Sequence, residues 1–344
     1  MICLGIESTA HTFGAGLVQA EINKGERRGN TGIVPSSFKI LADAKDVYKA
    51  PQGSGIHPRE ASRHHVETCY LVVENALKQA NIQFDDIDFI AYSAGPGLGP
   101  CLRVGAVVAR TLAAYFDKPL VPTNHAIGHI ELGKSLSGLS NPLVVIVSGG
   151  HTALAAMQEN SWRIFGETLD LTLGQLLDQL GRFIGLSSPA GPQIEKLALQ
   201  GALNQNFHPL PYIIKGNDVS YSGLLSAAKE LVSSRGAKSE DICFSVQEVA
   251  FSILAEATER ALAFTELDEL LVTGGVAANQ RLSAMLATMC KDRGVKIGVI
   301  PKQFAGDCGT QIATAGFAFY HNGNVVKPSE SFVRQSWRID QVKL

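Results

Sequence analysis

Two histidines four residues apart, His125 and His129, form the pattern with the clearest chemistry in this 344-residue sequence. If residues 124–129 are helical, this spacing places both imidazoles on one helix face, within reach of a single metal ion. Asp307 lies in a turn of small residues before a later helix, where its carboxylate is a candidate third ligand. Two unrelated surface histidines and a helix-capping aspartate are the alternative interpretation.

The residue after His125 argues against one familiar zinc chemistry. Peptidases with two helical histidines carry a glutamate directly after the first histidine as general base. That position is Ala126 here, so a metallopeptidase is disfavoured. The side chains that could accept a proton or support the metal ligands are Glu7, His11 and His151, and the choice among them stays open.

Two glycine-rich turns follow apolar runs, at residues 148–152 (Ser-Gly-Gly-His-Thr) and 274–275 (Gly-Gly). Unhindered backbone N–H groups at such turns bind phosphate oxygens, so we expect the first turn to hold a phosphate and the second a sugar or base. A tight hairpin without a ligand is the alternative. Asp178 and Glu195 are candidates to accept from ribose hydroxyls, or are solvated helix-face carboxylates.

The elements that must position these residues repeat along the chain. Each half begins with strand, short polar turn and strand, at residues 2–20 and 143–157. Each later supplies strand, glycine-rich turn and helix, at residues 87–116 and 267–293. Two such α/β halves make a nucleotide cleft lined by turns from both lobes. This is the layout of the duplicated actin, Hsp70 and sugar-kinase fold, in which each lobe has an RNase H-like core.

The length and composition agree with two lobes. An apolar fraction of 45% and a charged fraction of 18% suit a well-buried core, and 344 residues is roughly twice a usual domain. We expect lobes at residues 1–140 and 141–344, with a final helix near 305–325 packing back on the first. Residues 21–36 are polar and are expected to form an exposed hairpin tip.

Charge and cysteine content limit the partners and the compartment. The net charge of −2 is no general signature of nucleic-acid binding, so such binding would need a local patch or a basic partner. Six scattered cysteines without a C-x-x-C pair fit a reducing cytoplasm. No signal peptide or apolar run of the ~20 residues that span a membrane is expected. The local basic candidates are Arg59, Arg63, His64, His65 and Arg103.

Six motifs, in this order, carry a resemblance to a known family. They are Gly-Ile-Glu-Ser-Thr-Ala-His-Thr (5–12), Ile-His-Pro-Arg-Glu-Ala (56–61), Gly-Pro-Gly-Leu-Gly-Pro (95–100), the His125/His129 pair, Ser-Gly-Gly-His-Thr (148–152) and Gly-Gly-Val-Ala-Ala-Asn (274–279). Together they resemble the universal tRNA threonylcarbamoyladenosine transferase family, most closely its archaeal and eukaryotic branch, the catalytic subunit of the KEOPS complex. Bacterial TsaD is the counterpart. The resemblance extends from residue 2 to about residue 338.

The resemblance implies a reaction and its ligands. The reaction transfers the threonylcarbamoyl group from threonylcarbamoyl-adenylate to the exocyclic amine of the adenosine beside the anticodon, in tRNAs reading codons that begin with A. The implied ligands of one iron or zinc ion are His125, His129 and Asp307. The implied contacts to ATP, AMP or the adenylate are Ile146, Val147, Ser148, Gly149, Gly150, Asp178, Gly191, Glu195 and Asn279. The implied partners are tRNA, a small dimerising subunit, a separate kinase subunit and the synthase that supplies the adenylate.

Three positions depart from the family's pattern. A tyrosine that can reach the metal is Ile146 here, an expected asparagine is Gln175, and a Pro-Gly-Gly-Pro turn reads Pro-Ala-Gly-Pro at residues 189–192. Ile146 cannot ligate, so the matched set supplies at most three protein ligands. A small-molecule kinase on the same fold is disfavoured because residues 7–12 contain no aspartate. A non-catalytic nucleotide-binding scaffold is the remaining alternative.

Overall fold

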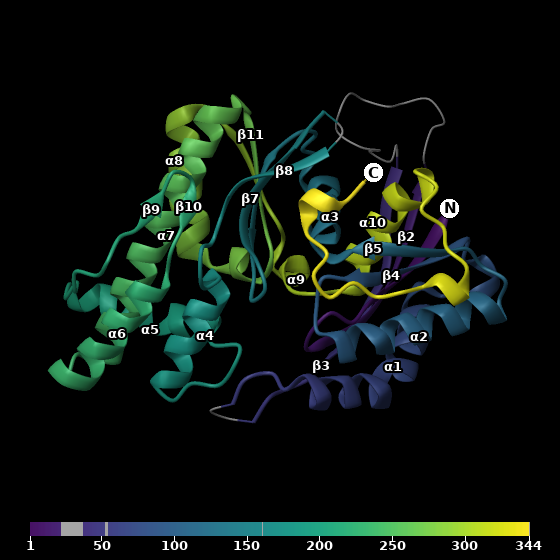
Figure 1. The fold of residues 1–344 in the computed structure, drawn as a ribbon, viewed down its shortest axis with the longest axis horizontal. Coiled ribbons are helices and arrows are strands. Elements are labelled where there is room, and N and C mark those ends of the chain that lie inside the picture. Colours follow the sequence, from purple (N-terminus) through teal and green to yellow (C-terminus); the bar gives the residue numbers. More distant parts are fainter. Residues whose placement is uncertain (22–36, 52–53, 160, 344) are drawn as a thin grey trace.

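The computed structural model describes residues 1–21, 37–51, 54–159 and 161–343, so most of the expected hairpin tip, residues 22–36, lies outside it. Two five-stranded mixed sheets form the framework (Figure 1). The strands of the first sheet, in spatial order, are β3 (Ser37–Val47), β2 (Thr12–Glu21), β1 (Ile2–Glu7), β4 (Phe89–Gly95) and β5 (Leu120–Asn124). Those of the second are β8 (Ser161–Glu167), β7 (Thr152–Gln158), β6 (Leu143–Val147), β11 (Glu269–Thr273) and β12 (Lys296–Val299).

The two sheets have the same topology. In each, the first three strands pair antiparallel and the last two extend the sheet in parallel. The duplicated α/β fold predicted from the repeat is therefore confirmed. The sequence pattern did not reveal β8, because this edge strand is only partly buried and its apolar residues do not alternate regularly.

Helices cover both sheets. On the first sheet, α1 (Pro58–Ala80) and α2 (Gly99–Tyr115) pack together and lie against β2, β3 and β4. On the second sheet, α7 (Ser239–Thr265) is the long central helix, which contacts β6 and β8. The other helices of this half are α4 (Leu173–Phe183), α5 (Gly191–Asn204), α6 (Ser222–Arg235) and α8 (Gln280–Arg293). Short elements are β9 (Ile214–Lys215), β10 (Asp218–Val219) and α9 (Lys302–Ala305).

Local sequence determines where two helices begin. The helix expected within residues 87–116 begins at Gly99, because a proline is well suited to the first turn of a helix. The helix expected within residues 267–293 begins at Gln280, since the side chain of Asn279 accepts hydrogen bonds from the first-turn amides and caps it. Residues Gly275–Ala278, before this cap, form a 3-10 turn.

The two sheets exchange a helix. The helix that follows β5 of the first sheet, α3 (His125–Ser137), packs against β6, β11 and β12 of the second. The helix that follows β12, α10 (Gly309–His321), packs against β1, β2 and β5 of the first. The exchanged helices also pack on each other, so they cross between the sheets (Figure 1). Segments from both halves of the chain therefore meet at this crossing.

Two apolar clusters form the core. The first includes Phe13, Phe89 and Phe317 around the first sheet, and the second includes Tyr221 and Phe251 around the second. Side chains on one face of the second sheet belong to the first cluster, so the halves share a continuous apolar contact. Within the described part of the chain, no helix combines the length and apolar character that a membrane span requires.

Substitution of a glycine tests the contact between α10 and the first sheet. A Cβ atom on Gly16 of β2 would overlap the backbone of Thr310, which neither element can relieve by rotating a side chain. We expect Gly16→Ala to lower the free energy of unfolding by about 3 kcal/mol or more. Chemical denaturation measures this value.

The matched control is Gly223→Ala on α6, where the added Cβ would lie 3.9 Å from its nearest neighbour, the tip of the Ile213 side chain. Alanine suits a helix better than glycine, so the control should change stability by less than about 1 kcal/mol. Equal effects of the two substitutions would contradict the close approach of α10.

Candidate metal centre

The two histidines lie at the start of α3. Asn124 caps this helix by accepting hydrogen bonds from the amides of Ala126 and Ile127, so His125 is its first residue. The helical spacing brings His129 to the same face, as predicted from the sequence. Both imidazoles are buried, which is unusual for a first helical turn unless it is covered by other elements.

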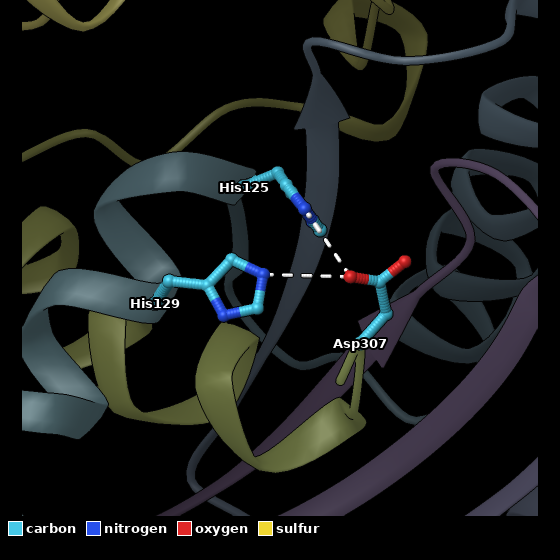
Figure 2. Close-up of side chains that lie close together, drawn as sticks. All are labelled: His125, His129 and Asp307. Carbon is cyan, nitrogen blue, oxygen red and sulfur yellow. Dashed lines mark ion pairs between the residues drawn. The ribbon is translucent and has the colours of Figure 1, made fainter. Parts of the chain in front are cut away.

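Asp307 reaches this pair from the turn before α10. Its Oδ1 atom lies 3.5 Å from Nε2 of His125 and 3.4 Å from Nε2 of His129. Figure 2 shows both rings directed at the same carboxylate oxygen. One ligand atom from each residue lies within 4.8 Å of the other two, so the structure brings together the three candidate ligands.

The cluster fits a divalent ion on two grounds. Nε2 of His129 is buried and makes no hydrogen bond among the described residues, only the 3.4 Å contact with Asp307, and a buried ring nitrogen left in this way is rare unless a ligand satisfies it. Two ligand atoms on a tetrahedral zinc, each about 2.0–2.1 Å from the ion, are about 3.3 Å apart. The observed separations of 3.4 and 3.5 Å are close to this value.

A second carboxylate contacts His125, at the ring nitrogen that does not face Asp307. Glu7 at the end of β1 is fully buried, and its Oε2 atom lies 3.0 Å from Nδ1 of His125. Because Nε2 faces Asp307, Nδ1 must carry the proton and donate it to Glu7. Carboxylates commonly fix the ring of a metal-binding histidine in this way. Glu7 therefore occupies a supporting position rather than an open one from which to accept a substrate proton.

Burial and charge together set the protonation of the cluster. Burial alone would lower the pKa of His125, but the carboxylates of Glu7 and Asp307 outweigh it and raise that pKa to about 9. Burial lowers the pKa of His129. Burial would raise the pKa of Asp307, but His125 and His129 hold it well below its usual range. Without metal at neutral pH, His125 is therefore the one protonated ligand.

The other two candidate proton acceptors also lie at this cluster. The ring of His151 stacks near that of His125, with centroids 6.5 Å apart. Burial and the two α3 histidines lower the pKa of His151 to about 4, so it is a neutral but weak base. His11 is close enough to influence the charge of Asp307, and its buried Nδ1 has no partner among the described residues.

The turn at residues 148–152 is partly occupied by its own hydrogen bonds. Ser148 Oγ accepts from the amides of Gly150 and His151, at 3.2 and 3.0 Å. Gly149 and Gly150 are exposed, and the amide of Gly149 has no intramolecular acceptor in the described part of the chain. The expected phosphate contact therefore reduces to this amide and the Ser148 hydroxyl. Ile146 and Val147 are fully buried in β6, and their contact with a nucleotide stays a prediction.

The other residues predicted to contact the nucleotide form hydrogen bonds within the second lobe. Asp178 accepts from the Ala190 amide at 2.7 Å, just before Gly191 begins α5. Glu195 accepts from the Gln280 amide at 2.7 Å, which joins α5 to α8. The side-chain amide of Asn279, the cap of α8, donates to Gln247 on α7. Nucleotide contact by these residues stays a prediction, and it would have to share side chains that already have protein partners.

Two residues beside His125 were not identified from the sequence. The Thr9 hydroxyl lies 3.3 Å from Nδ1 of His125, and the side-chain amide nitrogen of Gln311 lies 3.1 Å from the same atom. Because the Gln311 nitrogen and the protonated Nδ1 are both donors, their approach is a packing contact rather than a hydrogen bond. Asp307 lies in the turn before α10, so no helical spacing in the sequence pointed to Gln311. Thr9 is two residues after Glu7, and its amide donates to that carboxylate.

A cavity of about 840 Å³ lies away from this cluster, between α7 and α8. Its arginines are paired with glutamates, as in the Arg281–Glu248 and Arg293–Glu259 contacts. These pairs neutralise the charges that would attract an anion. The buried residues around His125 are therefore a better candidate site than this cavity.

Comparison with known sequences decides the family. The family described as "TsaD: tRNA N6-adenosine threonylcarbamoyltransferase" matches residues 39–314. The protein of that name from Thermofilum pendens is 45% identical over 339 residues, covering 98% of this chain and 95% of its own. The one from Archaeoglobus fulgidus is 44% identical over 344 residues, covering 100% and 99%. The chain belongs to this family. The predicted resemblance and the transferase class are confirmed.

Solved structures agree on the fold alone. HypF from T. kodakarensis aligns with a TM-score of 0.60 and 14% identity, covering 97% of this chain and 49% of that one. A second HypF structure aligns with a TM-score of 0.59 and 11% identity, covering 94% and 55%. At such identities the likeness supports the two-lobed architecture and says nothing about activity.

The protonation of the cluster predicts a pH dependence of metal binding. An ion must displace the proton of His125, whose pKa is about 9, and it meets the other two ligands already deprotonated. The association constant for Zn²⁺ should therefore rise about tenfold per pH unit between about pH 6.5 and about pH 9. Competition with a chromophoric chelator measures this slope.

The Glu7→Gln variant serves as the control. It removes a carboxylate that raises the pKa of His125, so the rise in affinity should end at a lower pH. An affinity independent of pH over this range, or a slope of two protons, would show that the cluster is not protonated as described.

Proposed function

We propose that this chain transfers the threonylcarbamoyl group from threonylcarbamoyl-adenylate to the N6 amine of the adenosine next to the anticodon, in tRNAs reading codons that begin with A. Membership of the family supports the reaction. The buried cluster of His125, His129 and Asp307 is the observation that supports a metal-dependent reaction. A cytoplasmic location agrees with the six free thiols.

His125, His129 and Asp307 would hold one divalent ion, iron or zinc. Two imidazoles and one carboxylate suit either metal and leave coordination positions for a water or a substrate oxygen. The ion, when bound, supplies Lewis-acid polarisation to the carbonyl or phosphate of the adenylate. Because Ile146 is buried in the core, it contributes no further ligand.

The chain's own residues orient the adenylate and manage a proton. In the turn at residues 148–152, the Gly149 amide and the Ser148 hydroxyl are the groups that are best placed to hold the phosphate. The adenosine nitrogen forms a bond to the carbamoyl carbon, the carbon–oxygen bond to phosphate breaks, and AMP leaves. The amine loses one proton in this exchange. His11 and His151 are the acceptors that the cluster offers.

The transfer is direct, without an acyl-enzyme. Cys308 is the nucleophile nearest the metal ligands in sequence, directly after Asp307. It is fully buried, and burial raises the pKa of its thiol well above the ordinary value. A buried thiol of this kind is protonated and unreactive at neutral pH. A covalent threonylcarbamoyl-protein trapped with adenylate alone would contradict direct transfer.

We also propose that α1 faces a partner of a KEOPS-type complex. This helix exposes Val66, Tyr70 and Leu71 by 63%, 71% and 54%. Their spacing places Val66 and Tyr70 on one face, beside the basic Arg59 and Arg63. An apolar strip next to arginines suits a helical subunit that also guides tRNA. A small dimerising subunit fits there, with a separate kinase subunit and the adenylate synthase completing the system.

Transfer to unmodified tRNA tests the proposal. Purified chain with its partner subunits and threonylcarbamoyl-adenylate should yield modified adenosine, detected by mass spectrometry of digested tRNA. The double variant His125→Ala/His129→Ala should lose about 10²-fold or more of this activity, because the cluster can no longer hold an ion. His208→Ala, which changes a histidine outside the cluster, is the matched control.

The outcomes distinguish three possible functions of the chain. Loss of product only in the double variant supports the metal-dependent transferase. Equal product from both proteins would retain the transferase and exclude a role of the ion. No product from the natural chain, with partners shown to bind, would favour a nucleotide-binding scaffold or a small-molecule kinase.

A further inference from the structure

The segment after α10 returns across the first sheet. Val326 donates its amide to the carbonyl of Leu120 on β5, and the segment continues along the ends of β4 and α2. Tyr92 donates its hydroxyl to the carbonyl of Phe332, and Arg110 on α2 donates to the carbonyl of Ser331. These three bonds hold the segment on the first sheet.

The fit of this segment to the turn after β4 is too close for a side chain. The amide of Arg334 donates to the carbonyl of Ala94 at 2.6 Å. Gly95 has a φ of +152°, and a Cβ there would overlap the carbonyl oxygen of Arg334. The amide of Gly97 donates to the carbonyl of Gln335. The segment is thus a built part of the fold, held by backbone bonds that do not depend on surface charge.

One side chain connects this segment to the metal helix. Asn124 uses its oxygen to cap α3, accepting from the amides of Ala126 and Ile127 at 2.9 and 3.2 Å. It uses its nitrogen to donate to the carbonyl of Trp337 at 3.0 Å, in a buried bond. The residue that follows the cap is the ligand His125. The position of the first ligand is thereby tied to the carbonyl of Trp337.

The far end of the segment lies on the second sheet. Arg338 pairs with Glu167 of β8 at 3.1 Å, and Ser161 of the same strand forms an antiparallel bridge with Lys343. Ile339 and Val342 are buried in the apolar cluster of the first sheet. Figure 1 shows this yellow segment running across the first sheet and ending near β8.

We propose that residues 331–343 form a strap between the two sheets, and that Asn124 and Trp337 are positioning residues that fix the start of α3 for metal binding. The strap spans the exchange of α3 and α10 from outside. It restrains the one helix that carries two of the three ligands. The inference rests on the proposed metal site for its role in affinity, but not for the existence of the strap.

Zinc affinity of the Asn124→Ser variant tests the positioning role. Serine still caps a helix, but its single, shorter hydroxyl replaces both polar atoms of the asparagine, so the amide donor that reaches the Trp337 carbonyl is lost. We expect Zn²⁺ to bind about tenfold more weakly at fixed pH, the size typical of losing a residue that orients a ligand. Asn204→Ser is the matched control, since it removes an asparagine side-chain amide that donates to Asp241 on α7, away from the metal cluster. Its zinc affinity should equal that of the natural chain.

Trp337→Ala extends the test to the strap itself. The tryptophan touches no ligand, yet loosening its carbonyl should reproduce the weaker zinc binding. The combined variant Asn124→Ser/Trp337→Ala should bind Zn²⁺ no more weakly than whichever of the two single variants binds it less tightly, because both substitutions act through one contact. Additive losses would overturn the proposal.

Amide hydrogen exchange without metal keeps this test separate from the proposed function. In Trp337→Ala the first turn of α3 should exchange about tenfold faster, while α8 is unchanged. If the natural chain binds no Zn²⁺, the proposed metal site fails and exchange alone decides about the strap. Unchanged exchange in both variants would overturn the strap, whatever the affinity.

Discussion

The exchange of α3 and α10 between the sheets is the constraint on which the rest of the structure depends. Glycines on β1 and β2 let α10 approach so closely that no side chain fits between them. That approach carries Asp307, which precedes α10, to the first sheet. The reciprocal helix α3 brings His125 and His129 to the same place from the other side. The metal cluster is thus a consequence of how two halves of a duplicated fold interlock.

The interlocking also leaves the cluster with unbalanced charge. Glu7 is fully buried and Asp307 is partly buried beside one protonated imidazole, so the metal-free cluster holds two negative charges against one positive charge. Buried charges are costly unless they are paired. Replacing the proton of His125 by a divalent ion balances the two carboxylates. The same carboxylates that would otherwise destabilise the site therefore favour a cation there, and the fully buried position of Glu7 keeps water from screening it.

Local patterns in the sequence predicted most of this arrangement, and long-range packing accounts for the rest. The spacing of His125 and His129 determines that they share a face once the helix forms, and repeated strand–turn–strand units predict the two sheets. No local pattern predicts that α3, which follows a strand of the first sheet, packs on the second. Nor does one predict that Asn279 and Glu195 form hydrogen bonds with neighbouring helices. Edge strand β8 lacks a clear alternation because a bulge between Ile164 and Gly166 interrupts its pairing with β7. No local spacing marked Gln311, because its contact with His125 exists only once α3 and α10 pack together.

The placement of the ligands links metal binding to the arrangement of the lobes. The histidines move with α3, which packs on the second sheet, whereas Glu7 and Asp307 belong to segments held on the first. A rotation between the sheets would separate these two groups, so an ion that needs all of them binds best to one arrangement. By thermodynamic linkage, anything that favours that arrangement strengthens metal binding, and the ion in turn stabilises it. An ion at the helix crossing would therefore be a structural pin as well as a participant in chemistry.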